Sequence, residues 1–178
     1  LCNAHLGRLR LTRAAIRASD EEDKPMPEVN LPQLPPDGPL LGIDPGAKSV
    51  GVAVSDQLRL IATPLETIPR GRKLRPVLDR LFDLYNERKA VGLVLGLPLN
   101  LDGRSGPRVQ AAKALAHHIL RAHDIPLAFQ DERLSSAEAQ RVMLDADLSR
   151  ARRAQAIDAS AAAIILQTAL DRLANHAP

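Results

Sequence analysis

The chain has very few aromatic residues, a single cysteine and no long apolar run. Aromatic residues make up 2% of its 178 residues, so we expect no aromatic platform for stacking nucleobases, and the core must be aliphatic. The one cysteine, Cys2, excludes an intramolecular disulfide framework and fits a reducing, cytoplasmic environment. No stretch approaches the roughly 20 apolar residues needed to cross a bilayer, so we expect no membrane partner.

Basic residues slightly outnumber acidic ones, and the formal net charge is +3. The first 38 residues hold 5 Lys and Arg against 6 Asp and Glu, whereas the remaining 140 hold 19 against 15. Two basic bunches occur in the second part: Arg70, Arg72, Lys73 and Arg75, and then Arg150, Arg152 and Arg153. Such bunches suit the phosphate backbone of a nucleic acid, although a solvated surface explains them equally well.

Residues 1–38 look like an extension of one folded domain at 39–178. An arginine-containing stretch is followed by acidic residues at 20–23 and by prolines from Pro25 to Pro36. A proline-studded segment is extended, so we expect this extension to be flexible and disordered. An organellar transit peptide would also be rich in arginine and poor in acidic residues, and that alternative stays open.

From Pro39 onward the apolar pattern predicts an α/β fold. Five strands are expected, at 40–44, 49–55, 60–68, 90–96 and 125–129. Helices are expected at about 74–84 and 106–122, and two more follow the last strand. Short connections make the first three strands antiparallel neighbours, whereas the later strands alternate with helices. The pattern predicts one five-stranded mixed sheet flanked by helices on both faces.

Carboxylates occur at three places where strand or helix ends can converge. Asp44 closes the first strand, and Asp131 and Glu132 follow the fifth. Asp158 lies in an alanine-rich helix that can approach a sheet closely. Oxygen ligands without Cys or His favour Mg²⁺ or Mn²⁺, and a buried carboxylate needs such a partner. Taken singly, Asp44 fits an ordinary turn, Glu132 a surface charge and Asp158 a helix N-cap, so only their combination indicates a metal site.

Basic and amide side chains follow the strand ends near these carboxylates. The candidates for gripping phosphate are Lys48, Arg104, Arg108 and Arg133, and Asn100 is a candidate for orienting a phosphate or sugar. The stretch from Asp147 to Gln155 looks like a mobile basic loop that closes over nucleic acid. Each of these charges is also typical of a solvated loop.

Four motifs of the chain resemble those of one known protein family. In chain order they are Gly42-Ile43-Asp44-Pro45-Gly46, Gly96-Leu97-Pro98-Leu99-Asn100, Asp131-Glu132-Arg133-Leu134-Ser135 and Asp158-Ala159-Ser160-Ala161-Ala162. Together they closely resemble the YqgF family, also called RuvX, over about residues 39–173. The family comprises bacterial Holliday-junction-resolvase-like proteins with the ribonuclease-H-like fold.

The resemblance implies a nuclease that hydrolyses phosphodiester bonds. Asp44, Glu132 and Asp158 would be its catalytic residues and would hold Mg²⁺ or Mn²⁺. The implied substrate is the 5′ end of precursor 16S ribosomal RNA in ribosome biogenesis, or alternatively branched DNA at a Holliday junction. The sequence separates neither these substrates nor a monomer from a homodimer. Strand alternation favours Glu132 over Asp131 as the ligand but leaves open which of them faces the site.

Two other function classes fit the same residues. A phosphotransferase of the actin and sugar-kinase class also has an Asp-x-Gly turn after a strand, but it needs two lobes, and 178 residues hold only one. A regulatory nucleic-acid-binding protein could keep the fold without cleaving.

The better-known junction resolvases carry an acidic residue at the end of the fourth strand, where this chain has Gly96-Leu97-Pro98.

Overall fold

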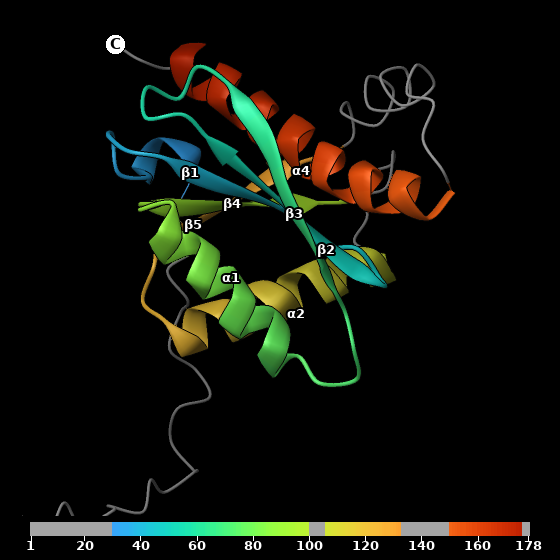
Figure 1. Ribbon diagram of the computed structural model, residues 1–178. Helices are drawn as coiled ribbons and strands as arrows, with labels where there is room; N and C mark the ends of the chain where they lie inside the picture. Colours follow the sequence, from blue (N-terminus) through green and yellow to red (C-terminus); the bar gives the residue numbers. More distant parts are fainter. Residues whose placement is uncertain (1–29, 100–105, 133–149, 176–178) are drawn as a thin grey trace, which may run out of the picture.

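The computed structural model describes residues 30–99, 106–132 and 150–175 (Figure 1). In the last helix the side chains are described from Ala159 onward. Residues 1–29 of the expected extension lie outside these ranges. Within the described ranges, none of the helices has the length and apolar character that a membrane span requires.

A five-stranded mixed sheet forms the centre of the fold, which confirms the sequence prediction. Its strands are β1 (Leu40–Asp44), β2 (Ser49–Ser55), β3 (Ala62–Pro69), β4 (Gly92–Leu97) and β5 (Leu127–Asp131). Their order across the sheet is β3-β2-β1-β4-β5. β2 is antiparallel to β1 and β3, whereas β4 is parallel to β1 and β5. The carboxyl ends of β1, β4 and β5 therefore meet at one edge of the sheet.

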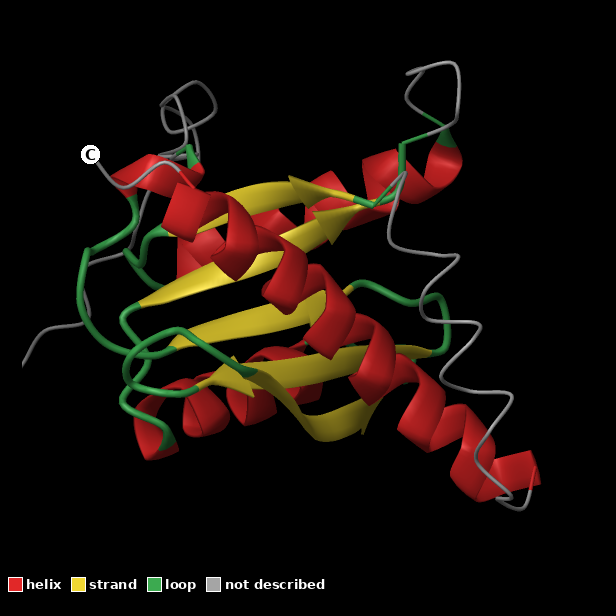
Figure 2. Cartoon of the chain, turned by 90° about the horizontal axis from the view of Figure 1, so that it is seen from above, coloured by secondary structure: helices red, strands yellow, loops and turns green. Residues whose placement is uncertain are grey.

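Helices cover both faces of the sheet (Figure 2). α1 (Arg75–Glu87) and α2 (Pro107–Ala122) lie on one face, and α4 (Arg150–Asn175) crosses the other. Because strand side chains alternate between faces, Leu41 and Ile43 pack with α1 and α2, whereas Leu40 packs with α4. Burying each such side chain stabilises the fold by roughly 1.5–3 kcal/mol.

Helix α4 packs directly on the backbone of β1, because β1 has a glycine at the crossing point. A Cβ atom at Gly42 would lie 2.6 Å from Cβ of Leu166 and 2.8 Å from the carbonyl oxygen of Ala162. Ala162 and Ala169, which are completely buried, present only methyl groups on this side of the helix. The small residues on strand and helix thus set the distance between α4 and the sheet.

Strand β3 begins at Ala62 and not at Leu60, where the sequence placed it. The Oδ1 atom of Asp56 accepts hydrogen bonds from the backbone N–H groups of Leu60 and Ile61, at 2.7 and 2.8 Å. These bonds hold the residues in a loop, where their side chains are exposed. The carboxylate of Asp56 therefore determines where the strand starts, and the pattern of apolar residues does not show this effect.

Part of the expected extension packs on the domain. A 3-10 helix, η1 (Leu31–Gln33), precedes β1. Leu31 and Leu34 are buried in the core on the α4 side of the sheet. The side chain of Arg59 donates hydrogen bonds to the carbonyl oxygens of Pro35 and Gly38. Residues 31–38 are therefore attached to the folded part by both apolar and polar contacts.

Helix α4 begins at Arg150, so residues 150–155 are helical. The prediction of a mobile basic loop is wrong for these residues, and 147–149 lie outside the described ranges. Arginine and alanine both have high helix propensity, which favours a helix here. The alternative of Asp158 as a helix N-cap is also wrong, because Asp158 lies two turns inside the helix.

Candidate active site

Two of the predicted acidic residues lie at the edge of the sheet where the parallel strands end. Asp44 is the last residue of β1, and Glu132 directly follows β5. β4 lies between these strands, with Ile43 opposite Leu95 and Gly96 opposite Gln130. Since parallel strands keep their register, Gly96, the last residue but one of β4, lies between the two acidic residues.

The side chain of Glu132 lies over Gly96. A Cβ atom at Gly96 would collide with Oε1 of Glu132 and would lie 2.7 Å from Cδ1 of Ile165 on α4. The backbone N–H of Glu132 donates a 3.2 Å hydrogen bond to the carbonyl oxygen of Leu97, which fixes the chain at this point. The missing side chain at position 96 therefore creates the space between β4 and α4 in which the carboxylate lies.

Glu132 and Asp44 share the face of the sheet that α4 covers. Gly42 contacts α4, and Asp44 is two residues further along the same strand, so it points to the same face. Asp131 alternates to the other face: it is paired with Leu97, whose side chain packs against the core formed with α1 and α2. This geometry favours Glu132 over Asp131 as the partner of Asp44.

The electrostatic surroundings of Glu132 resist its ionisation. Burial raises its pKa to about 7, and the charge of Asp44 contributes to the increase, with a smaller contribution from Asp131. The positive charge of Arg108, at the start of α2, acts in the opposite direction and lowers the pKa. Two carboxylates from different strands are therefore close enough to repel each other.

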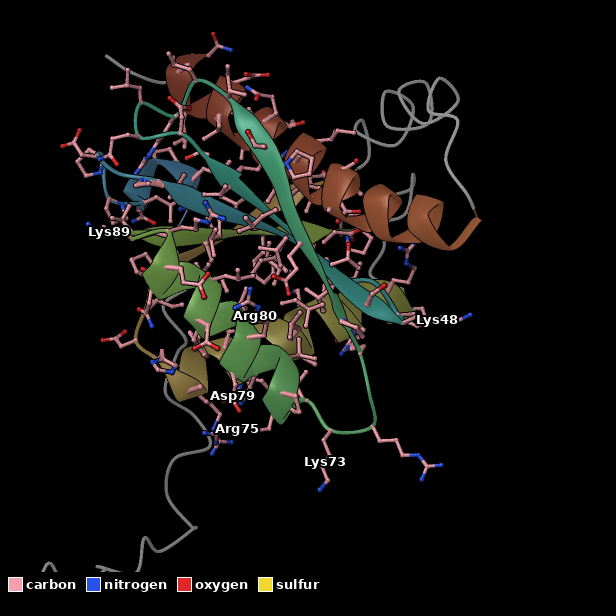
Figure 3. The ribbon with its side chains drawn as sticks, in the orientation of Figure 1. Lys48, Lys73, Arg75, Asp79, Arg80 and Lys89 are labelled. Atoms are coloured by element: carbon pink, nitrogen blue, oxygen red, sulfur yellow. The ribbon has the colours of Figure 1, made fainter. Side chains whose placement is uncertain are left out.

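Basic residues flank this acidic pair. Lys48 lies in the turn between β1 and β2 and extends into solvent (Figure 3). The same turn is held by Arg70, whose backbone N–H donates to the carbonyl oxygen of Lys48 at 2.8 Å. The guanidinium of Arg70 donates to the carbonyl oxygen of Gly46 at 3.0 Å. Arg70 thus supports the turn that follows Asp44.

The other predicted site residues are described only in part or not at all. Asp158 lies in α4, one turn before Ala162, and its side chain is not described. Asn100, Arg104 and Arg133 lie outside the described ranges. Among the side chains that the structure describes, no group of three or more His, Cys, Asp or Glu is placed to hold a metal ion. The described part thus brings together two of the predicted carboxylates.

Sequence reasoning missed the roles of Gly96 and Arg70. Gly96 looked like the end of an ordinary buried strand, although a glycine beside an expected acidic cluster is a signal for a close approach. Arg70 belongs to one of the two basic bunches of the sequence, and no sequence pattern shows that its side chain turns back toward Gly46.

Known structures define the class of the fold. The structure of T. thermophilus RuvC in complex with a Holliday junction substrate matches with a TM-score of 0.51 and 15% identity. The match covers 76% of this chain and 96% of that chain. Together with the strand order, it shows that the chain has the ribonuclease-H-like fold of RuvC-like resolvases.

The family follows from comparison with known sequences. The family model described as "RuvX: Holliday junction resolvase" matches residues 38–172, and the chain belongs to this family. A protein of Rhodopseudomonas palustris (strain BisA53), named "Putative pre-16S rRNA nuclease", is 51% identical over 142 residues, covering 80% of this chain and 86% of the relative. A protein of Rhodobacter capsulatus with the same name is 52% identical, covering 80% and 89%. The family prediction is confirmed.

Proposed function

We propose that this chain is a divalent-metal-dependent nuclease that processes the 5′ end of precursor 16S ribosomal RNA in the cytoplasm. Family membership and the name shared by relatives of about 50% identity support a phosphodiester hydrolase with this substrate. The observation that carries the proposal is the acidic pair at the sheet edge, where Glu132 is held beside Asp44 despite the cost of burying its charge.

The acidic pair fits a divalent cation. Two carboxylates that repel each other in a partly buried place are stabilised when a cation lies between them. Their hard oxygen atoms match Mg²⁺ or Mn²⁺ and not zinc. A cation held there would neutralise charge on the scissile phosphate and lower the pKa of the attacking water. Asp44 and Glu132 would hold it from the strand ends.

Asp158 completes the proposed ligand set from the helix. Gln167, in the second half of α4, bonds the backbone of Leu60 and Ala62 at the edge of the sheet opposite to Asp44. The helix therefore approaches the Asp44 edge toward its N-terminus. Gly42 contacts Ala162, and moving two residues along β1 and one turn back along α4 leads to positions 44 and 158.

Basic residues around the acidic pair would bind the substrate. Arg108 is exposed and close enough to lower the pKa of Glu132, and Lys48 is exposed in the turn that follows Asp44, so both are suited to phosphate oxygens. Asn100, Arg104 and Arg133 are proposed as further contacts to phosphate or sugar. Their task is to bring the negatively charged backbone to two carboxylates that would otherwise repel it.

A second candidate substrate is branched DNA. The family description names Holliday junction resolvases, and the same hydrolytic step serves RNA and DNA. A resolvase would act as a homodimer, because symmetric cutting of a four-way junction needs two sites, whereas a monomer suffices for trimming RNA. A parallel assay that offers a precursor 16S fragment and a four-way junction, each with and without Mg²⁺, decides between them.

The Asp44→Asn variant makes this assay specific for the proposed site. We expect metal-dependent cleavage to be lost while the fold and most of the nucleic-acid binding remain, because the substitution removes one ligand charge without changing size. Equal cleavage by the variant and the parent would refute the active site. Binding of the parent to RNA without any cleavage would favour the non-catalytic alternative, and saturable ATP binding would revive the kinase alternative.

A further inference from the structure

The segment that joins β3 to α1 is strongly basic and begins beside the candidate active site. Residues 67–78 contain no Asp or Glu but four basic residues: Arg70, Arg72, Lys73 and Arg75. The two hydrogen bonds of Arg70 attach the start of this segment to the turn at Gly46 and Lys48. Because the turn directly follows Asp44, the segment starts at the sheet edge that carries the acidic pair.

The basic residues of this segment have different surroundings. The guanidinium of Arg70 is half-buried and engaged with the turn. Arg75 forms an ion pair with Asp79, at 2.7 Å. Arg72 and Lys73 are exposed, and they form no ion pair within the described residues. The chain therefore uses Arg70 for structure and leaves Arg72 and Lys73 available to a ligand.

The two acidic residues that border this segment in the sequence are paired with other arginines. Glu66 precedes the segment, and its carboxylate is bound by Arg80 at 2.6 Å, which lowers the pKa of Glu66. Asp79 follows the segment and is paired with Arg75. Figure 3 shows Lys48 and Lys73 extending into solvent from the turn and from the segment below it. Positive charges thus extend from the turn after Asp44 along the basic segment.

We propose that Lys48, Arg72 and Lys73 form a phosphate track that binds the backbone of the nucleic-acid substrate beyond the cleavage position. This inference rests on the proposed nuclease function and adds where the uncut flank of the substrate lies. From Arg70, which is bonded to the turn, to residues 72 and 73 an extended chain spans up to about 7–11 Å. Lys48 would bind nearest the cleaved bond, and Lys73 farthest from it.

The test compares two double variants that lose the same charge. Arg72→Gln with Lys73→Gln removes the outer part of the track. Arg88→Gln with Lys89→Gln removes two exposed basic residues at the other end of α1, where Figure 3 shows Lys89. Binding of a labelled precursor 16S fragment is measured without divalent metal over a range of salt concentrations, and cleavage is then measured with Mg²⁺.

In a plot of log K, the logarithm of the binding constant, against the logarithm of the salt concentration, we expect the slope of the track variant to be smaller in magnitude by about 1.4–1.8, which corresponds to the loss of two phosphate contacts. The control variant should keep the slope of the parent. KM should rise with kcat unchanged, because Arg72 and Lys73 touch no reacting group. Equal slopes for the track variant and the parent would overturn the proposal. Equal reductions of the slope in the track variant and the control variant would also overturn it. A parent that binds through the track but never cleaves would refute the nuclease and leave the track standing.

Discussion

The carboxylate of Glu132 occupies the space that a side chain at Gly96 would need. Gly96 lies on β4, between β1, which ends at Asp44, and β5, which Glu132 follows, so its missing Cβ lets the second carboxylate reach across the sheet edge toward the first. The acidic pair therefore depends on a residue with no functional group of its own.

Replacing Gly96 by alanine should damage both stability and activity. The added methyl group would collide with Oε1 of Glu132 and with Ile165, so we expect a loss of about 1–3 kcal/mol in the free energy of unfolding and loss of cleavage. Gly71→Ala is the matched control, because a Cβ there has no neighbour within 4 Å. Urea unfolding and cleavage rates check both effects, and an active, fully stable Gly96→Ala protein would contradict the described geometry.

The stability of the metal-free protein should fall as the pH rises from about 4.5 to 7. The folded protein raises the pKa of Glu132 from 4.5 to about 7, so protonated Glu132 favours the folded state, and this contribution is lost as the group ionises. We expect a decrease of about 1–3 kcal/mol, reduced by the partial exposure of the group. Unfolding curves at several pH values measure it.

The Glu132→Gln variant tests whether that pH dependence belongs to Glu132. Its side chain stays neutral, so its stability should change less between pH 4.5 and 7 than that of the parent. Added Mg²⁺ should restore the stability of the parent at pH 8 and have little effect on the variant. Identical pH profiles for both proteins would show that Glu132 ionises without cost.

Replacing Gly42 by alanine should push α4 away from β1. The new Cβ would lie 2.6 Å from Cβ of Leu166 and 2.8 Å from the backbone oxygen of Ala162, and backbone does not yield as a flexible side chain does. We expect a destabilisation of about 1–3 kcal/mol and a reduced cleavage rate, since the helix carries Asp158. If stability drops and the cleavage rate per folded molecule is unchanged, α4 contributes no part of the site.

The fold could be predicted from the sequence because its signals are local. The continuous apolar run of β4 predicts a strand, and the short connection between β1 and β2 predicts an antiparallel pair. The structure confirms both. The predicted start of β3 is wrong because the strand start depends on hydrogen bonds that loop N–H groups donate to Asp56. The prediction of a loop at the start of α4 is wrong because a run of Arg and Ala has no apolar periodicity that distinguishes a helix from a loop.

The candidate site could be predicted only as a set of residue types. Acidic residues after two strands pointed to Asp44 and to the pair Asp131 and Glu132, but the face that each occupies depends on the registers of β4 and β5. The role of Gly96 depends on the path of a side chain from another strand. A glycine beside an acidic cluster can indicate a close approach, but which side chain makes that approach is decided only when the chain has folded.

Binding of Mn²⁺ to the parent and to single-site variants tests the central claim most directly. Electron paramagnetic resonance counts free Mn²⁺ during titration of the parent, Asp44→Asn, Glu132→Gln and Asp131→Asn proteins. We expect one strong site in the parent and in Asp131→Asn, and at least a tenfold weaker site in Asp44→Asn and Glu132→Gln, because the latter two lose a ligand charge. Undiminished binding by Asp44→Asn and Glu132→Gln would contradict a cation shared between the two strand ends.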